Sequence, residues 1–468
     1  MITTLREPPM SAPQRFVVRT ELPVSAAEAF AWHERPGALD RLTPPWESVQ
    51  VVQRADNLQP GQQVKIQVRL GPLTVPWIAE HTRYVPGVEF QDVQVRGPFA
   101  KFEHTHRLVP QDGNSCWLED DIEYALPGGR LGRWLAGPAI RRKLERMFHY
   151  RHTVLQADLA QAASQSGLST MKVLITGATG LVGSALVPLL TTTGHEVSRL
   201  VRSQPTEPND IPWDPAQGIL HPARLEGHDA VVHLAGENIA GARWTTAFKQ
   251  RIRDSRLVGT RRLCETLAKL SHKPKTLVCA SAIGYYGDRG GEALTETSAP
   301  GEGFLPDVCR EWEAACEPAR QAGIRVVNLR IGVVLSPKGG ALAQMLTPFR
   351  LGGGGVVGSG RQYWSWIAID DVVGAILHCL AHAELSGPVN ATAPSPVTNH
   401  EFTKTLGAVL HRPTVIPMPA FAARLALGEM ADALLLSSTR VLPQQLQSTG
   451  YHFRCPTLES ALRHVLGQ

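Results

Sequence analysis

The pattern of apolar and polar positions changes at about residue 170. Before it, short runs in which apolar and polar residues alternate are separated by Gly and Pro, which is typical of strands with one buried face. These runs are residues 16–22, 64–70, 74–85, 89–95, 102–109 and 115–126. A short helix with Ser25 as its N-cap is expected after the first run, and a long amphipathic helix over about residues 140–159 after the last. A helix, a curled antiparallel sheet and a long closing helix would together form a cup.

From Lys172 onward, continuous apolar strands alternate with helices. The predicted strands are residues 172–176, 196–201, 229–235, 276–282 and 324–334, and the predicted helices are residues 180–194, 244–270 and 305–322. This alternation predicts an α/β Rossmann-type, doubly wound parallel sheet. After about Arg361 the alternation breaks up, and we expect a smaller lobe at the carboxyl edge of the sheet that ends in a helix at residues 458–466.

Composition narrows the classes of function. The chain has 468 residues, which suits two or three domains. Its net charge of +5 comes from 47 basic and 42 acidic residues, so charge does not indicate a nucleic-acid partner. No apolar run is long enough to span a membrane, and no signal peptide is recognisable. The seven cysteines include no CxxC pair, which argues against a disulfide framework and fits a cytoplasmic protein.

The motif with the clearest chemistry is TGATGLVG at residues 176–183. Gly177 permits a tight turn, Gly180 lets the backbone approach a pyrophosphate, and Gly183 allows close contact between helix and sheet. The following helix directs its N-terminus at the phosphates. We therefore predict a dinucleotide site in which the first contacts come from Thr176, Gly177, Gly180, Leu181, Val182 and Gly183, and further contacts from Leu234, Ala235 and Gly236 after a later strand.

The end of the second strand of this domain indicates which dinucleotide is bound. A site for NAD usually places Asp or Glu there, where the carboxylate binds the ribose hydroxyls. This chain has Arg202 and Ser203 instead. A guanidinium at that position would form charge-assisted hydrogen bonds with a 2′-phosphate, which predicts NADP(H) as the cofactor. The alternative is an ordinary solvated arginine at a strand end.

Several segments resemble one enzyme family. The GxxGxxG turn is similar to that of extended short-chain dehydrogenase/reductases. Further similar segments are residues 233–239 (HLAGENI), 243–260, 280–290 (ASAIGYYGDRG), 329–342, 365–376 and 397–402. Together they resemble the epimerase-like, atypical subfamily over about residues 171–467. Its members are mostly named by similarity, as nucleotide-sugar epimerases or as cell-division proteins.

The first part resembles a second family. The order of its elements and the segments DDIEYALPGG (120–129) and LERMFHYRH (144–152) are similar to the helix-grip fold of START-like, polyketide-cyclase-like domains. This resemblance covers about residues 14–160 and implies a module that binds an apolar ligand. The expected organisation is thus a helix-grip domain at 14–160, a linker at 161–170, an NADP(H)-binding Rossmann domain at 171–360 and a substrate-side lobe at 361–468.

The catalytic residues depart from the family pattern. Short-chain reductases use a Tyr and a Lys spaced YxxxK, in which the Lys lowers the pKa of the Tyr. No YxxxK occurs from Met171 onward. Ser281 and Tyr285 are the candidates for acid–base chemistry, with pocket lining as the alternative. Conventional redox or epimerase chemistry is therefore in doubt.

Asn238, Trp364 and Trp366 are the candidates for substrate contacts. The two tryptophans would share one face of an extended segment, although a pair of indoles buried in the lobe is the alternative. In the first domain, His104 and His106 share one face of a strand, and His149 and His152 lie three apart on a helix. No carboxylate is fixed beside them by spacing, so we expect no metal site.

Three functions remain open. One is an atypical NADP(H)-dependent reductase- or epimerase-like enzyme that acts on a small molecule, with an apolar ligand captured or presented by the first domain. The second is a non-catalytic NADP(H)-binding sensor or regulatory protein, in which the missing YxxxK motif reflects the absence of catalytic activity. The third is a structural or assembly role that rests on the surface of the first domain.

Overall fold

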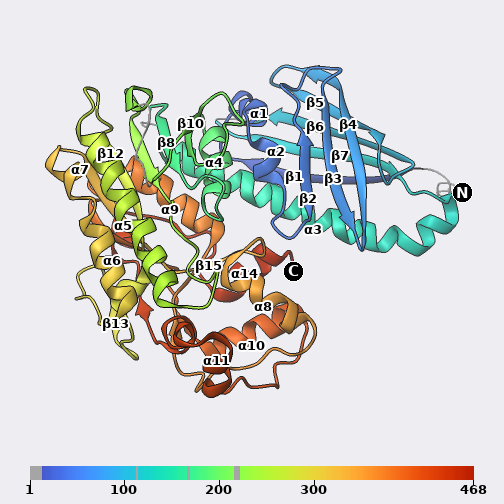
Figure 1. The fold of residues 1–468 in the computed structure, drawn as a ribbon. Helices are drawn as coiled ribbons and strands as arrows, with labels where there is room; N and C mark the ends of the chain where they lie inside the picture. The colour runs from blue at the N-terminus through green and yellow to red at the C-terminus, as the bar shows by residue number, and fades with distance from the viewer. Residues whose placement is uncertain (1–12, 112–113, 166–168, 216–221) are drawn as a thin grey trace, which may run out of the picture. The chain divides into compact units, whose positions relative to one another are not determined.

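The computed structural model describes residues 13–111, 114–165, 169–215 and 222–468 (Figure 1). The chain divides into two compact units, one mainly of residues up to 167 and the other mainly of residues from 168 onward. Residues 166–168 of the expected linker lie outside the described residues. Residues 161–164 of that linker are helical rather than extended, because the long helix before them continues through alanine-rich sequence to Ser164.

The first unit is built on a seven-stranded antiparallel sheet with the order β1-β7-β6-β5-β4-β3-β2. Its strands are β1 (Gln14–Leu22), β2 (Val49–Gln53), β3 (Gln63–Leu70), β4 (Leu73–Val85), β5 (Glu89–Arg96), β6 (Lys101–Pro110) and β7 (Cys116–Ala125). The sequence pattern did not predict β2. This strand lies at the sheet edge and is largely exposed, so it has no clear alternation of apolar and polar residues.

Three helices accompany this sheet: α1 (Ala26–Glu34), α2 (Ala38–Leu42) and α3 (Gly129–Ser164). The predicted cap of α1 is confirmed, since Ser25 Oγ accepts a hydrogen bond from the Glu28 amide at 3.2 Å. Helix α3 runs along the sheet (Figure 1), and a buried ion pair of 2.7 Å joins Arg41 of α2 to Asp158 of α3. The antiparallel sheet and its closing helix form the predicted helix-grip fold.

The second unit is built on a seven-stranded parallel sheet with the order β10-β9-β8-β11-β12-β14-β18. Its strands are β8 (Lys172–Thr176), β9 (Glu196–Val201), β10 (Asp210–Pro212), β11 (Ala230–His233), β12 (Thr276–Ala282), β14 (Arg325–Ile331) and β18 (Gly387–Ala391). The strand order reverses between β8 and β11. This is the doubly wound Rossmann arrangement that the sequence predicts.

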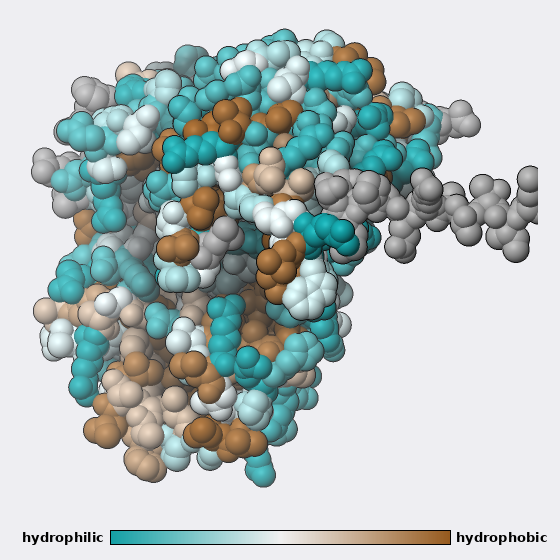
Figure 2. Space-filling model, turned by 90° about the vertical axis from the view of Figure 1, so that its right-hand side faces the viewer, coloured by the Kyte–Doolittle hydropathy of each residue, from teal (hydrophilic) through white to brown (hydrophobic). Residues whose placement is uncertain are grey.

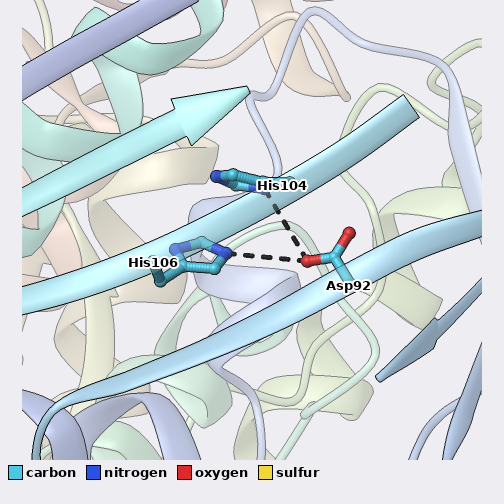
Figure 3. A group of neighbouring side chains, drawn as sticks. All are labelled: Asp92, His104 and His106. Atoms are coloured by element: carbon cyan, nitrogen blue, oxygen red, sulfur yellow. Dashed lines mark ion pairs between the residues drawn. The ribbon is translucent and has the colours of Figure 1, made fainter. Parts of the chain in front are cut away.

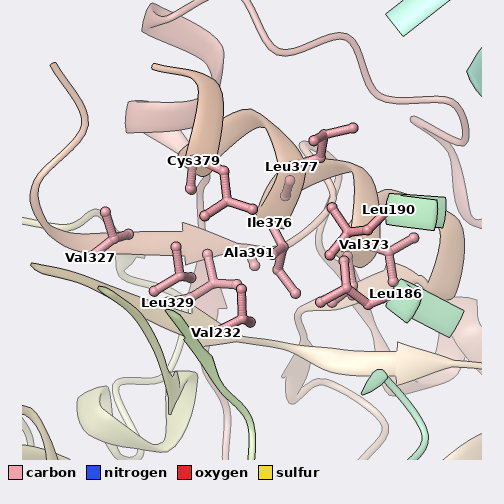
Figure 4. Close-up of a cluster of buried hydrophobic side chains, with 14 of the residues drawn as sticks. Leu186, Leu190, Val232, Val327, Leu329, Val373, Ile376, Leu377, Cys379 and Ala391 are labelled. Carbon is pink, nitrogen blue, oxygen red and sulfur yellow. The ribbon is translucent and has the colours of Figure 1, made fainter. Parts of the chain in front are cut away.

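Helices bury both faces of this sheet, which explains why its strands are apolar throughout. On one face lie α4 (Gly183–Thr192) and α9 (Ile369–Ala381), and on the other α5 (Thr246–Ala268), α6 (Phe304–Ala314) and α7 (Glu317–Gln321). In β8, Val173 and Ile175 join the first cluster while Leu174 joins the second. Figure 4 shows side chains of α4 and α9 packed over those of the strands.

A smaller lobe completes the second unit. Its helices are α8 (Gly340–Arg350), α10 (Asn399–Leu410), α11 (Ala420–Leu427), α12 (Glu429–Ala431) and α14 (Leu458–Leu466), while α13 (Gln444–Ser448) packs beside β18 of the parallel sheet. Short strand pairs connect its parts: β15 (Val333–Leu335) with β17 (Trp366–Ala368), β16 (Tyr363–Trp364) with β19 (Val397–Thr398), and β13 (Ala293–Leu294) with β20 (Arg440–Val441). Figure 2 shows apolar side chains over the lower part of the view. The exposed apolar side chains of the lobe include Val415, Ile416, Phe421 and Leu425, which lie before and within α11.

The structure differs from the expected division at residue 360. Strand β18 belongs to the parallel sheet and α9 packs on that sheet, although both lie after residue 360. Conversely, α8 lies before residue 360 and packs in the core of the lobe. The sequence pattern did not predict strand β18, because its sequence, GPVNA, contains no apolar run. Among the described residues, no helix combines the length and the apolar character needed to cross a bilayer.

Candidate nucleotide-binding and active site

The glycine turn lies at the carboxyl end of β8, beside the point where the strand order reverses. Gly177 has φ 70°, a left-handed conformation that favours glycine. A Cβ at Gly177 would lie 2.8 Å from the carbonyl carbon of Leu234, and one at Gly183 would overlap the carbonyl oxygen of Gly177. The turn therefore requires glycine at both positions, and it leaves a cradle of backbone at the N-terminus of α4 that fits a pyrophosphate.

A buried hydrogen-bond network fixes the two strand ends beside this cradle. Thr176 Oγ1 accepts hydrogen bonds from the amides of Leu234 and Ala235 at 3.2 and 3.1 Å, and lies 2.6 Å from His233 Nδ1. The other ring nitrogen of His233 lies 2.9 Å from Thr260 Oγ1 of α5. Burial lowers the pKa of His233 to about 4, so the ring is neutral. The network assigns a donor to Nε2 and an acceptor to Nδ1.

Thr176, Leu234 and Ala235 are thus brought together with the glycine turn. Leu181 and Val182 are half-buried in the turn, and Gly236 is exposed after Ala235. Sequence reasoning missed His233 and Thr260. The sequence did contain a signal for this network. His233 is the first residue of HLAGENI, and a histidine at the end of a fully buried strand needs polar partners.

Arg202 and Ser203 follow β9, and both are exposed. The neighbouring Arg199, unlike Arg202, forms an ion pair within the sheet: its guanidinium binds Asp210 of β10 through two hydrogen bonds of 2.6 and 2.9 Å. Burial alone would raise the pKa of Asp210, but Arg199 and two backbone amides lower it to about 2. Asp210 is therefore committed to Arg199, and the guanidinium of Arg202 extends from the end of β9 into solvent.

The two catalytic candidates lie in one buried ion-pair network. Ser281, at the end of β12, donates a hydrogen bond to Glu313 Oε1 at 2.8 Å. Glu313 of α6 binds Arg330 of β14 through two hydrogen bonds of 2.8 and 2.9 Å. The Arg330 guanidinium in turn lies over the ring of Tyr285, 3.5 Å from its centroid. Arg330 and Glu313 thus connect Ser281 with Tyr285.

The neighbouring Tyr286 has a structural role. Its side chain is fully buried, its hydroxyl donates to Asn390 Oδ1 at 2.7 Å, and it accepts from Arg330 Nη1 at 2.9 Å. Burial raises the pKa of Tyr286 to about 12. Tyr285, by contrast, is half-buried. Sequence reasoning missed Glu313 and Arg330, although each lies in a segment that it singled out.

The substrate-side candidates are placed differently from one another. Asn238 is exposed and its side chain accepts a hydrogen bond from the Ala240 amide at 3.0 Å. Trp364 and Trp366 are 6% and 0% exposed in the core of the lobe, and their indole N–H groups donate to the carbonyls of Leu435 and Ser395. A fully enclosed indole offers no surface to a substrate, so Trp366 acts in packing rather than in binding.

Comparisons with known proteins agree with this geometry. The model of the NAD dependent epimerase/dehydratase family matches residues 173–391, and that of polyketide cyclase / dehydrase and lipid transport matches residues 22–149. A domain of unknown function matches residues 418–465. An epimerase family protein of Mycobacterium bovis is 46% identical over 293 residues, which are 63% of this chain and 97% of that protein. The human epimerase family protein SDR39U1 is 40% identical over 301 residues, which are 63% of this chain and all of that protein.

Two solved structures are similar to this one. The nucleoside-diphosphate sugar epimerase of Corynebacterium glutamicum has 35% identity and a TM-score of 0.81, and the match covers 97% of this chain and 90% of that one. Human SDR39U1 with NADPH has 37% identity and a TM-score of 0.59, and the match covers 63% of this chain and 99% of that one. The chain belongs to the NAD-dependent epimerase/dehydratase family, with a polyketide-cyclase-like, START-like domain before its Rossmann domain.

Proposed function

We propose that the second unit binds NADP(H) in the cradle between β8 and α4 and acts on a small-molecule substrate as an atypical reductase- or epimerase-like enzyme. The observation that carries the proposal is the glycine cradle at the reversal of strand order, with Arg202 exposed at the end of the neighbouring strand β9. The similar human protein was solved with NADPH, which supports the same cofactor here.

The selectivity for NADP(H) would come from Arg202. Both dinucleotides present the same pyrophosphate to the same turn, so the turn cannot distinguish them. The 2′-phosphate of NADP(H) is the group that differs, and a guanidinium binds it through charge-assisted hydrogen bonds. Asp210, the buried carboxylate on the next strand, is bound to Arg199 and so leaves the ribose position without a competing acidic group.

When bound, the nicotinamide supplies hydride chemistry. The chain's own contribution would come from the network around Ser281 and Tyr285. Arg330 holds Tyr285 by its ring face and holds Glu313 through two hydrogen bonds, while Glu313 orients the Ser281 hydroxyl. In this arrangement an arginine–glutamate pair, and not a lysine, contacts the candidate serine and tyrosine.

Calorimetric titration of NADPH and NADH into the full chain tests the cofactor. The native protein should prefer NADPH, and Arg202→Asp should weaken NADPH binding by about ten- to hundredfold while it changes NADH binding little. The matched control is Arg261→Asp, which changes an exposed arginine of α5 and should leave both affinities unchanged. A native preference for NADH, or a preference for NADPH that survives Arg202→Asp, would overturn the assignment.

A second candidate function is a non-catalytic NADP(H) sensor. One observation favours it: the Ser281 hydroxyl is buried and donates a hydrogen bond to Glu313, within a network that also stabilises the fold. In that case cofactor binding would be retained in variants of Ser281 and Tyr285, and no turnover would depend on them. The apolar ligand expected for the first unit stays a prediction, because none of the described contacts tests it.

A further inference from the structure

A group of ionisable side chains occupies the middle of the helix-facing side of the first sheet. The buried side chains of β7 alternate as Cys116, Leu118, Asp120, Ile122 and Tyr124. Asp120 lies at the centre of this row, and His152 of α3 reaches it at 2.5 Å. Along this row, one hydrophobic cluster with Ile122, Phe102 and Phe148 lies on one side of Asp120, and another with Leu118, Leu108 and Leu155 lies on the other. Burying ionisable groups between two apolar clusters costs stability unless the groups are paired and hydrogen-bonded, so their presence here calls for an explanation.

The strand register assembles the group. Asp92 of β5 lies opposite His104 of β6, and His106 of β6 lies opposite Asp120 of β7. His104 and His106 alternate with Thr105 and so share one face. Both carboxylates therefore meet the two imidazoles on that face. The sequence analysis expected no metal site because spacing fixed no carboxylate beside the histidines, and the register provides two.

Three ligand atoms lie at distances suited to one metal ion. Asp92 Oδ1 is 3.7 Å from His104 Nδ1 and also 3.7 Å from His106 Nε2, as the dashed lines in Figure 3 mark. The three atoms all lie within 4.8 Å of one another. Two ligands that each bind zinc at about 2.0–2.1 Å with a tetrahedral angle are about 3.4 Å apart. A small inward movement of these side chains would complete the site.

The remaining nitrogen of each imidazole faces a second carboxylate. Asp120 Oδ1 is 3.0 Å from His104 Nε2 and 2.6 Å from His106 Nδ1. Metal-binding histidines nearly always direct the nitrogen that does not bind the metal at a carboxylate or a carbonyl, which fixes the tautomer and the orientation of the ring. Asp120 does this for His104 through a hydrogen bond, whereas His106 Nδ1 approaches Asp120 at ion-pair distance without the geometry of a hydrogen bond. This arrangement of an outer carboxylate is an observation independent of the three inner atoms.

Two further buried histidines adjoin the group. Within the part of the chain that the structure describes, His33 Nε2 and His81 Nδ1 have no hydrogen-bond partner. The His33 ring lies 5.9 Å from that of His106, centroid to centroid. The Asp92 side chain is 21% exposed, so solvent reaches this carboxylate.

We propose that Asp92 Oδ1, His104 Nδ1 and His106 Nε2 bind one divalent transition-metal ion of the zinc class. Asp120 hydrogen-bonds His104 and lies at ion-pair distance from His106, on the side of the rings away from the metal. Three protein ligands leave a coordination position for water or for an oxygen atom of a small molecule, as in zinc sites that handle ligands rather than sites that only stabilise a fold. The first unit would then bind a polar, metal-coordinating molecule.

The competing occupant is a proton. Burial alone would lower the pKa of His106, but Asp120 and Asp92 outweigh burial and raise it to about 9. Without a metal, a protonated His106 would thus neutralise part of the charge of the two carboxylates. The experiment must therefore measure the metal itself.

The full chain, freed of any affinity tag and treated with EDTA, is dialysed against ZnCl₂ and then against buffer, and its metal content is measured by mass spectrometry. We expect one zinc ion per chain. Titration with CoCl₂ should give visible absorption of a low-symmetry cobalt site at one equivalent, and added Zn²⁺ should abolish it. If the folded native chain takes up neither ion stoichiometrically, the proposal fails and the site holds a proton.

Variants locate the ion. Asp120→Asn should lower the zinc affinity by about 10–100-fold, and Asp92→Asn and His104→Gln should lower it further. His149→Gln is the matched control, because His149 lies on α3 one turn from His152 but is exposed. Circular dichroism verifies folding, and Asp92→Asn, the most exposed of these changes, keeps the test valid if the others unfold. Zinc retained at native affinity by folded Asp92→Asn, or lost equally from His149→Gln, would overturn the assignment.

Discussion

Tyr285 and Tyr286 are adjacent in sequence and both contact Arg330, but their different contacts suit them to different roles. The hydroxyl of Tyr286 is enclosed and binds Asn390 and Arg330. Tyr285 contacts the same guanidinium, but through its ring face, and it is half-buried. A hydroxyl that already binds two buried groups stabilises the fold, whereas the ring contact of Tyr285 leaves its hydroxyl as the candidate for substrate contact under the proposed function.

This difference predicts different consequences for the two tyrosines. Tyr286→Phe should lower the free energy of unfolding by about 1–3 kcal/mol, because Asn390 and Arg330 lose a buried partner. Tyr285→Phe should change stability by less than about 0.5 kcal/mol, because phenylalanine keeps the stacking on Arg330. If Tyr285 and Ser281 are the acid–base pair, Tyr285→Phe and Ser281→Ala should each lower turnover at least about tenfold.

Denaturant unfolding measures the stability of each variant, and NADPH oxidation with a panel of nucleoside-diphosphate sugars and small carbonyl compounds measures turnover. Unchanged rates in both Ser281→Ala and Tyr285→Phe would mean that other residues catalyse the reaction, or would support the function of a non-catalytic sensor. A native protein that binds NADPH but turns over none of the panel would support the sensor as well.

At the scale of elements, the turn between β8 and α4 uses glycines for different purposes. A Cβ at Gly183 would meet backbone, namely the Gly177 carbonyl oxygen and Ala178 Cα at 2.7 Å. A Cβ at Gly180 would meet Gly177 O at 3.2 Å, which needs only a small shift. Gly183 therefore determines how closely α4 approaches the strand, and exposed Gly180 is the position where, under the proposed function, a phosphate would approach the turn.

Alanine substitutions should separate these two roles. Gly183→Ala should lower the free energy of unfolding by about 1–3 kcal/mol, because the clash is with backbone that cannot give way. Gly180→Ala should cost less stability and should weaken NADPH and NADH binding alike, because the methyl group occupies the path of the pyrophosphate. Denaturant unfolding and calorimetry measure the two effects.

Gly291→Ala is the control, because a Cβ there would meet only the ring of Tyr363 at 4.0 Å. It should change neither quantity. Equal loss of stability in Gly180→Ala and Gly183→Ala would contradict the separate roles. Unchanged cofactor affinity in Gly180→Ala would place the pyrophosphate elsewhere.

At the scale of the whole molecule, the second unit should fold without the first. It has its own sheet and its own hydrophobic clusters, and the similar human protein matches only this part of the chain over its full length. A chain that begins at Met171 should unfold cooperatively and bind NADPH within about threefold of the full chain, since a separate core defines a domain. Calorimetry and thermal unfolding verify this. Aggregation, or loss of cofactor binding on removal of the first unit, would contradict it.

Local sequence determined much of this protein. The period of two before residue 160 and the apolar strands after Lys172 predicted both sheets, since burial on one face or on two leaves different patterns. The glycine turn was predicted at Gly177 and Gly183 because its geometry depends on residues close in sequence. Strand β18 was missed because a short strand at the end of a sheet needs no apolar run of its own.

Tertiary structure decided which distant side chains meet. Glu313 and Arg330 come from a helix and a strand, and spacing along the chain does not reveal that they connect Ser281 to Tyr285. Asp92 and Asp120 face His104 and His106 only through the register of β5, β6 and β7. A slip of one residue would turn either carboxylate to the opposite face, so that register, which only the folded sheet fixes, determines whether these groups form a site.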